Sequence, residues 1–258
     1  MKHIREIVEY RDMIGSLVRR ELRGRYEKSV LGFLWSFLSP LFQILIYNIV
    51  FTQVFHNGMP NFYIYLMTGL LPWNFFSDSV GQAAGSIIYN AEMIKKIYFP
   101  REVLVIAEVS SKFVNMLLSF VVMAGFLIFS GCGFSRHIVL LPMIMLTEFL
   151  LALGFSFLIS ATTVYLRDLE YVVNVILMAW IWGTPVLYAI DGVQNPTLLR
   201  LLHLNPMTGV ICSYHSILYY HEFPPVSDWL IPLAEGAAVI VIGYLVFRNL
   251  NKRFVEEL

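Results

Sequence analysis

Charged residues are scarce in this chain. Lys, Arg, Asp and Glu make up 14% of its 258 residues, whereas a soluble domain usually has about 25%. Hydrophobic residues make up 58%, too many for the polar surface that a soluble protein of this size needs. We therefore expect an integral membrane protein. Basic and acidic residues balance at 18 each, so no excess positive charge is present to neutralise phosphates, and no nucleic acid is expected as a partner.

Familiar catalytic motifs are also missing. No Gly-Lys pair occurs, so the chain has no P-loop and is not expected to bind ATP productively by itself. The patterns H-E-x-x-H, C-x-x-C and G-x-S-x-G do not occur either, and we expect no catalytic site and no metal. An outer cluster, which a metal could use but which we expect to be ordinary polar residues, consists of His203, His215, His221 and Glu222.

Six stretches are apolar and long enough to cross a bilayer, which takes about 20 residues. They lie near residues 31–54, 62–88, 109–130, 138–165, 172–190 and 229–247. The predicted fold is therefore an all-α integral membrane protein, with a single six-span domain over residues 31–258. Cys132 and Cys212 are the two cysteines; the sequence permits a disulfide between them, but two free thiols are the simpler expectation.

Positive charge gives the orientation, because Lys and Arg gather on the cytoplasmic side of membrane proteins. Sixteen of the eighteen basic residues precede the first span, follow the sixth, or fall in or beside the second and fourth links. The opposite side has only Arg136 and Arg200. Both termini are therefore predicted to be cytoplasmic.

Residues 1–30 form a predicted amphipathic helix before the first span. Apolar residues recur at helical spacing, at Ile7, Ile14, Leu17 and Val18 among others, with charged residues between them. The basic face suits lipid headgroups at the cytoplasmic interface. The helix is either a surface anchor or a lever that also docks a cytoplasmic partner, and periodicity does not separate the two.

Two cytoplasmic links are candidates for contact with a partner. Residues 89–101 read as a short amphipathic helix that ends before Pro100. An exposed helix with several apolar residues is typical of a docking site. The link from Arg167 to Glu170 is a second, smaller candidate.

The fifth connection, residues 191–228, is long and largely apolar. We expect two short helices, about Pro196–His203 and Pro206–Tyr219, because Pro is favourable at a helix start and an Asn cap precedes each. Fifteen residues are too few to cross and return, so a pair of re-entrant helices in the outer leaflet fits best. An interfacial loop is the alternative.

Ionisable and aromatic residues within the spans raise two further questions. Glu108 and Lys112 are spaced to form a local ion pair. Asp78, Glu148 and Glu235 have no such partner; they are either a proton relay or, as we expect, groups that hydrogen-bond between helices. Aromatic residues in the first and fifth spans either line a pore, where they would stack on sugar rings, or face lipid.

Six motifs, taken in order along the chain, resemble the membrane permeases of type-2 ABC polysaccharide exporters, which export O-antigen, capsule and teichoic acid. The motifs resemble the O-antigen branch most. They are RELRGRYEKSVLGFLWSFLSPL at 20–41, GLLPW at 69–73, IKKIYFPR at 94–101, YLRDL at 165–169, TPVLY at 184–188 and LNPM at 204–207.

The resemblance implies a homodimer in the bacterial inner membrane, with two ATPase subunits that bind ATP and magnesium, and a lipid-linked glycan as substrate. It implies the following roles for residues of this chain. Coupling to the ATPase would involve Glu92, Met93, Lys95, Lys96, Tyr98, Arg101, Arg167 and Asp168. Channel lining at the dimer seam would involve Phe33, Phe37, Tyr47, Phe51, Trp180 and Tyr188. An outer gate would involve Tyr214, Tyr219 and Tyr220.

Three alternatives stay open at this point. A proton-coupled carrier would depend on the isolated carboxylates and need no ATPase. A membrane enzyme acting on a lipid-linked sugar would need the outer histidine cluster. A type-2 ABC exporter of drugs or lipids, from the same superfamily, is the alternative most similar to a polysaccharide exporter. The two amphipathic cytoplasmic segments favour a permease, and the motifs do not identify the glycan or its lipid anchor.

Overall fold

A computed structural model describes residues 7, 9–24, 34–54, 56 and 58–257 of the chain. Phe33 and the middle of the first motif, residues 25–33, lie outside the described residues. The described part is all-α: its helices are joined by turns and loops, and it contains no strand. Its helices, in chain order, are α2 (Arg11–Gly24), α3 (Trp35–Ile49), η2 (Val50–Val54), α4 (Phe62–Tyr89), α5 (Ala91–Lys96), α6 (Glu102–Phe129), η3 (Arg136–Leu140), α7 (Leu141–Thr163), α8 (Leu169–Trp180), η4 (Ile190–Gly192), α9 (Pro196–His203), α10 (Pro206–His215), η5 (Ser216–Tyr220), α11 (Val226–Leu250), η6 (Asn251–Arg253) and α12 (Phe254–Glu257).

Four helical segments among the described residues are long and apolar enough to cross a membrane: Phe37–Val54, Glu102–Phe129, Arg136–Thr163 and Val226–Arg253. They correspond to four of the six predicted spans. The other two predicted spans are α4, which is long but less apolar, and α8, which is apolar but has only 12 residues.

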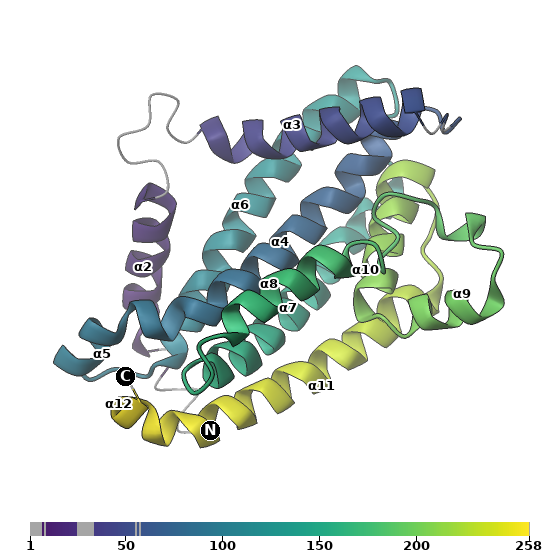
Figure 1. The fold of residues 1–258 in the computed structure, drawn as a ribbon. Helices are drawn as coiled ribbons and strands as arrows, with labels where there is room; N and C mark the ends of the chain where they lie inside the picture. The colour runs from purple at the N-terminus through teal and green to yellow at the C-terminus, as the bar shows by residue number, and fades with distance from the viewer. Residues whose placement is uncertain (1–6, 8, 25–33, 55, 57, 258) are drawn as a thin grey trace.

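Helix α4 is the centre of the bundle. Most of its side chains are buried, and α3, α6, α7 and α8 all pack against it. Figure 1 shows α4 running beside α6, α7 and α8, with α11 along the edge and α3 crossing obliquely. Since neighbouring helices rather than lipid surround α4, its sequence can include polar residues that a lipid-facing helix could not tolerate.

Helix boundaries differ from the prediction at two spans. The fifth span was expected to continue to residue 190, but α8 ends at Trp180 and turns follow it. Gly183 and Pro185 lie in these turns; proline cannot donate a backbone hydrogen bond and keeps the residue before it out of the helical region. The third span begins at Glu102 rather than near residue 109, two residues after Pro100 and with Arg101 as its N-cap.

Contacts between distant segments define the two ends of the bundle. At one end Arg20 donates to Asn90, and Arg101 donates to Asn251, which brings α2, the α4–α5 junction and the end of α11 together. At the other end Tyr219 donates to the carbonyl of Pro60. The basic links and the basic C-terminal segment therefore share one end, as the orientation prediction requires, and α9 lies at the opposite end (Figure 1).

Small residues let α7 and α11 approach closely. A Cβ at Gly154 would lie 2.6 Å from the backbone nitrogen of Ile240, and a Cβ at Gly243 would collide with the carbonyl of Gly154. Membrane helices use such glycines to bring backbones together where the hydrophobic effect gives no driving force. The two helices therefore form one closely packed unit.

Candidate coupling surface and polar cleft

The link between α4 and α6 has the predicted amphipathic form. Helix α5 ends at Lys96, before Pro100. Ile94 of this helix and Phe99 of the segment after it are buried in the core. Tyr98 is 87% exposed and Ile97 is 58% exposed. Both follow the end of α5, where Ile97 has extended backbone, and a large exposed apolar surface is typical of a docking site.

The charged residues of this link divide into two groups. Glu92, Lys95 and Lys96 are exposed, and Lys96 pairs with Glu92 at 3.5 Å. Met93 is partly buried against the core. Arg101 instead points inward: it donates to the backbone and side chain of Asn251 and lies over the ring of Phe254.

Arg101 therefore anchors the link to the C-terminal segment of the chain. Burial lowers the pKa of its guanidinium, and the nearby carboxylate of Glu102 acts in the opposite direction. A residue held in this way positions the link. Its predicted contact with an ATPase stays a prediction.

The second link is connected to the first. Arg167 and Asp168 are exposed at the turn before α8. The hydroxyl of Tyr89, the last residue of α4, donates to Glu170 at 2.7 Å. This bond joins the two predicted docking segments, although no sequence pattern pairs Tyr89 with Glu170.

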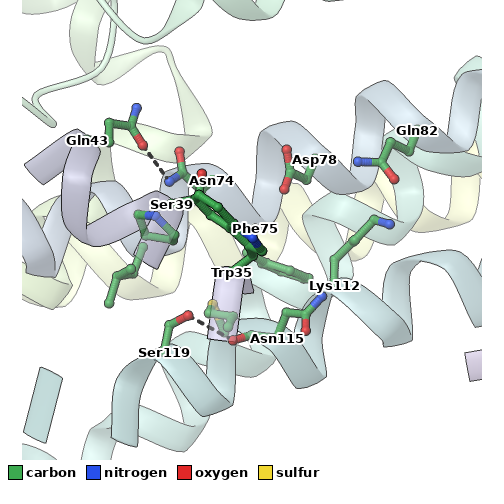
Figure 2. Close-up of a pocket in the computed structure, with 13 residues that line it drawn as sticks. Trp35, Ser39, Gln43, Asn74, Phe75, Asp78, Gln82, Lys112, Asn115 and Ser119 are labelled. Carbon is green, nitrogen blue, oxygen red and sulfur yellow. Dashed lines mark hydrogen bonds between the residues drawn. The ribbon is translucent and has the colours of Figure 1, made fainter. Parts of the chain in front are cut away.

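A polar cleft of about 570 Å³ lies between α3, α4 and α6 (Figure 2). Three polar stripes line it, one from each helix. Helix α4 contributes residues spaced four apart, α6 contributes residues three and four apart, and α3 contributes two residues four apart, so each set lies on one helix face. The polar lining residues are Asn74, Asp78 and Gln82 of α4, Lys112, Asn115 and Ser119 of α6, and Ser39 and Gln43 of α3.

One hydrogen bond crosses the cleft, and two aromatic side chains are part of its walls. Gln43 accepts a hydrogen bond from Asn74 at 3.0 Å, which links α3 to α4 across the cleft (Figure 2). Trp35 and Phe75 contribute aromatic surface to the same walls. Helix α3 is otherwise loosely attached, since Ile44 is its only fully buried side chain among those described.

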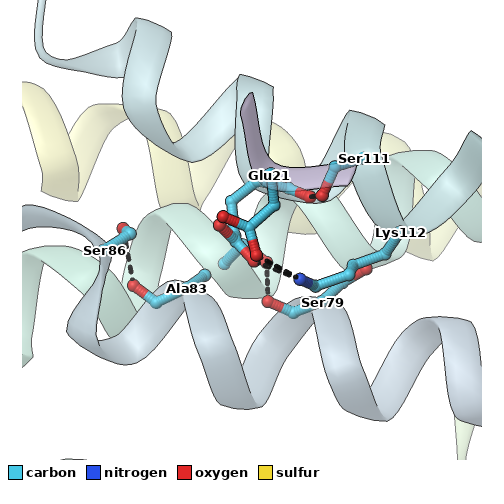
Figure 3. A network of polar contacts seen from close by, with 8 residues as sticks. Glu21, Ser79, Ala83, Ser86, Ser111 and Lys112 are labelled. Carbon is cyan, nitrogen blue, oxygen red and sulfur yellow. Dashed lines mark hydrogen bonds and ion pairs between the residues drawn. The ribbon is translucent and has the colours of Figure 1, made fainter. Parts of the chain in front are cut away.

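Lys112 lies in the cleft beside two carboxylates, those of Glu108 and of Glu21 in α2. Its amine pairs with Glu108 one turn earlier, which confirms the predicted local pair. It also reaches Glu21 of α2 at 3.5 Å (Figure 3). The Lys112 side chain is only 2% exposed, so the pairing compensates a charge that would be costly to bury alone.

The aromatic residues predicted to line a channel lie in different surroundings. Phe37 faces α4 and α6 in a small apolar cavity, and Phe51 contacts the ring of Phe62. Tyr47 is partly buried against the core. Trp180 packs edge-on against Trp73, Phe76 and Phe155, and the hydroxyl of Tyr188 donates to the carbonyl of Trp182 at 3.0 Å. Their channel role stays a prediction.

The two outer helices have the predicted caps. Asn195 accepts from the backbone of Thr197 at 3.0 Å, and Asn205 accepts from the backbone of Met207 at the same distance. Asn205 also donates to Gly183 and to Thr184. This second set of bonds ties the start of α10 to the turns after α8.

The predicted gate residues lie on α10 and the turn that follows it. Tyr214 is fully buried and donates to Glu148 of α7 at 2.7 Å. Tyr219 packs edge-on against Tyr65 and against Tyr220, which is 42% exposed. Their gating role stays a prediction.

The remaining chemical candidates are dispersed. Glu148 has an interhelical partner, as expected, whereas Glu235 is half-buried on α11. Cys132 and Cys212 are free thiols, which confirms the simpler expectation. In the part of the chain that the structure describes, no three His, Cys, Asp or Glu side chains meet in a way that could hold a metal; His215, for instance, stacks on Tyr65 instead.

Sequence reasoning missed the cleft, although a signal for it exists. Asp78 has no charged partner nearby in the sequence, but Asn74 and Gln82 lie four residues before and after it, on the same helix face. A search for polar residues four apart within apolar stretches would have found this face.

These features define a multi-pass, all-helical membrane protein with an exposed apolar surface at its basic end. Residues 13–219 match the family described as ABC-2 type transporter. The chain therefore belongs to the ABC-2 type transporter family, which confirms the resemblance seen in its motifs.

Relatives of the chain support a transporter rather than an enzyme. It is 34% identical to the O-antigen export system permease protein RfbA of Myxococcus xanthus over 256 residues, which cover 99% of this chain and 98% of that protein. It is 31% identical to a protein of the same name from Klebsiella pneumoniae over 248 residues, 96% of this chain and 95% of that one. A shorter match, 33% over 91 residues, covers 33% of this chain and 35% of the polysialic acid transport protein KpsM of Escherichia coli.

Proposed function

We propose that this chain is the transmembrane subunit of an ATP-driven exporter that moves a lipid-linked polysaccharide outward across a bacterial inner membrane. The observation that carries the proposal is the near full-length similarity to permeases named for O-antigen export. In this proposal α3, α4, α6, α7, α8 and α11 are the six spans, and both termini are cytoplasmic. The distribution of basic residues between the two ends of the bundle supports this orientation.

ATP hydrolysis is assigned to a separate pair of subunits. The chain lacks a P-loop, so ATP and magnesium would bind in the partner. The exposed surface of Ile97 and Tyr98, with Glu92 and Lys95 beside it, is the proposed docking site. The bond between Tyr89 and Glu170 would make the two cytoplasmic links move together.

The proposed channel lies at the seam between two copies of the chain. Helix α3 exposes Phe42, Ile46 and Ile49, and α8 exposes Val175 and Met178. A second copy that covered part of these faces would place the aromatic residues of the first and fifth spans near the seam. Helices α9 and α10 would be the re-entrant pair at its outer end.

Purification tests this proposal first. We expect the tagged chain, extracted from its native membranes in mild detergent, to carry an equal amount of a P-loop ATPase subunit. Deletion of the gene should remove the polysaccharide from the cell surface, and the wild-type gene should restore it. A complex without an ATPase, or unchanged surface polysaccharide, would refute the proposal.

Variants of the link give a sharper test. Replacement of Lys95 and Lys96 by Ala, or of Glu92 by Ala, should lower export and uncouple it from ATPase activity. Arg253→Ala removes an exposed charge at the same end of the bundle and is the matched control. Normal export and unchanged ATPase activity in the link variants would remove the assignment of the docking surface.

A further inference from the structure

The cleft between α3, α4 and α6 has the composition of a carbohydrate-binding site. Amide groups of Gln43, Asn74, Gln82 and Asn115 line it together with serine hydroxyls, and Trp35 provides an aromatic wall. Amides and hydroxyls both donate and accept hydrogen bonds, which matches the hydroxyl groups of a sugar. Aromatic faces complement the apolar faces of sugar rings.

We propose that this cleft binds a saccharide segment of the transported glycan within a single subunit, separately from the seam between two copies. The inference rests on the proposed export function, because it takes the exported glycan as the ligand. The volume of about 570 Å³ lies within the range of roughly 300–1,000 Å³ that is usual for small-molecule sites.

The charges of the cleft favour a neutral ligand over a phosphate. Among the described residues that line it, Lys112 is the only cation and Asp78 is the only anion. The amine of Lys112 already lies between Glu108 and Glu21. A phosphate would therefore meet an excess of carboxylates rather than the cations that phosphate sites use.

One polar atom that lines the cleft has no hydrogen-bond partner in the described part of the chain. A sugar hydroxyl could supply one. The side-chain oxygen of Asn115 is buried and has no hydrogen-bond partner among the described residues. A buried polar atom without a partner is costly. A hydroxyl group of a ligand would donate to this oxygen and remove the cost.

The cleft also has a route toward the basic end of the bundle. Gln82 lines both the cleft and a second groove of about 550 Å³. The second groove continues past Glu21 and Ser86 to Asn90, the cap of α5. Polar groups therefore continue from the docking link into the membrane, where they are otherwise rare.

Cysteine protection tests the site directly. Ser39→Cys and Ser119→Cys place a thiol on opposite walls, and Ser16→Cys on the exposed face of α2 is the control. All three are made in a chain with Cys132→Ser and Cys212→Ser. Each is assembled with its ATPase, and labelling by a charged thiol reagent is timed in inside-out membrane vesicles with ATP hydrolysis blocked by vanadate.

Two kinds of vesicle are compared: those whose host makes the lipid-linked glycan, and those whose host lacks the first sugar transferase of its synthesis. We expect the glycan to slow labelling at both cleft positions by at least about fivefold, which corresponds to roughly four in five clefts occupied. Ser16→Cys should label at the same rate in both.

Two results would overturn the inference. Equal labelling rates with and without glycan would exclude the cleft as its binding site, and no labelling at either cleft position in glycan-free vesicles would show that water does not reach it. Failure of the export proposal is detected separately, because it requires that no ATPase co-purifies or that gene deletion leaves the surface polysaccharide unchanged.

Discussion

Replacement of Lys112 by Met removes the one cation of a buried charge cluster. Its side chain is 2% exposed, and those of its partners Glu108 and Glu21 are 15% and 35% exposed. Loss of one partner of a buried pair costs about 3–5 kcal/mol, because the remaining charge is left without compensation. Glu21 is partly screened by solvent, so we expect a loss near the lower limit, about 3 kcal/mol.

The double variant Glu108→Gln with Lys112→Met should recover most of this stability. Replacement of both partners of a buried pair by neutral groups of similar volume is often neutral or stabilising. Lys96→Met is the matched control, since Lys96 forms the same type of pair with Glu92 but both side chains are exposed. An exposed pair of this kind contributes only about 0.3–0.5 kcal/mol.

Thermal unfolding of the detergent-solubilised permease without its ATPase, followed by size-exclusion chromatography, measures all three variants, so that the proposed docking role of Lys96 does not affect the comparison. A loss of about 3 kcal/mol in a chain of this size should lower Tm by roughly 6–12 °C. The control should stay within about 2 °C of wild type. Two results would contradict the prediction: a Tm of Lys112→Met equal to that of the control, or a double variant that is no more stable than Lys112→Met alone.

Three further substitutions probe the packing and the links. Gly154→Ala should separate α7 from α11 and cost about 1–3 kcal/mol, whereas Gly125→Ala, where a Cβ would meet no atom within 4 Å, should leave Tm unchanged in the same unfolding assay. Tyr89→Phe removes the hydrogen bond to Glu170 and should reduce export per ATP hydrolysed in reconstituted vesicles, with assembly intact; unchanged coupling would separate the two links. Asn205→Ala should cost about 1–2 kcal/mol, because a helix cap is lost, and faster proteolysis of the outer segment would report it.

Local patterns predicted the parts of the fold that depend on local physics. The caps at Asn195 and Asn205 follow from an Asn-Pro pair at a helix start, and α5 ends before Pro100, at Lys96. The pair between Glu108 and Lys112 follows from a spacing of four residues on one helix. Each of these depends on neighbours within one or two turns of the chain, and the structure has all of them.

Contacts between segments that are far apart along the chain could not be predicted from the sequence. The bond from Tyr89 to Glu170 and that from Tyr214 to Glu148 join residues 81 and 66 positions apart. No periodicity encodes such a pairing. The early end of α8 has a different cause. Apolar residues continue past Trp180, so hydropathy alone predicts a longer span. The turns that contain Gly183 and Pro185 end the helix earlier.

The order of elements along the chain connects the docking link with the cleft. Helices α4 and α6 form two of the three cleft walls, and α5 with residues 97–101 is the covalent connection between them. Helix α2 joins both places, because Arg20 bonds to Asn90 at the cap of α5 and Glu21 bonds to Lys112 in the cleft. A partner that displaces the link must therefore move the adjoining ends of α4 and α6, or break these bonds. If the cleft holds sugar, as we propose, the same displacement would change its width and so its affinity, without any relay through the rest of the bundle.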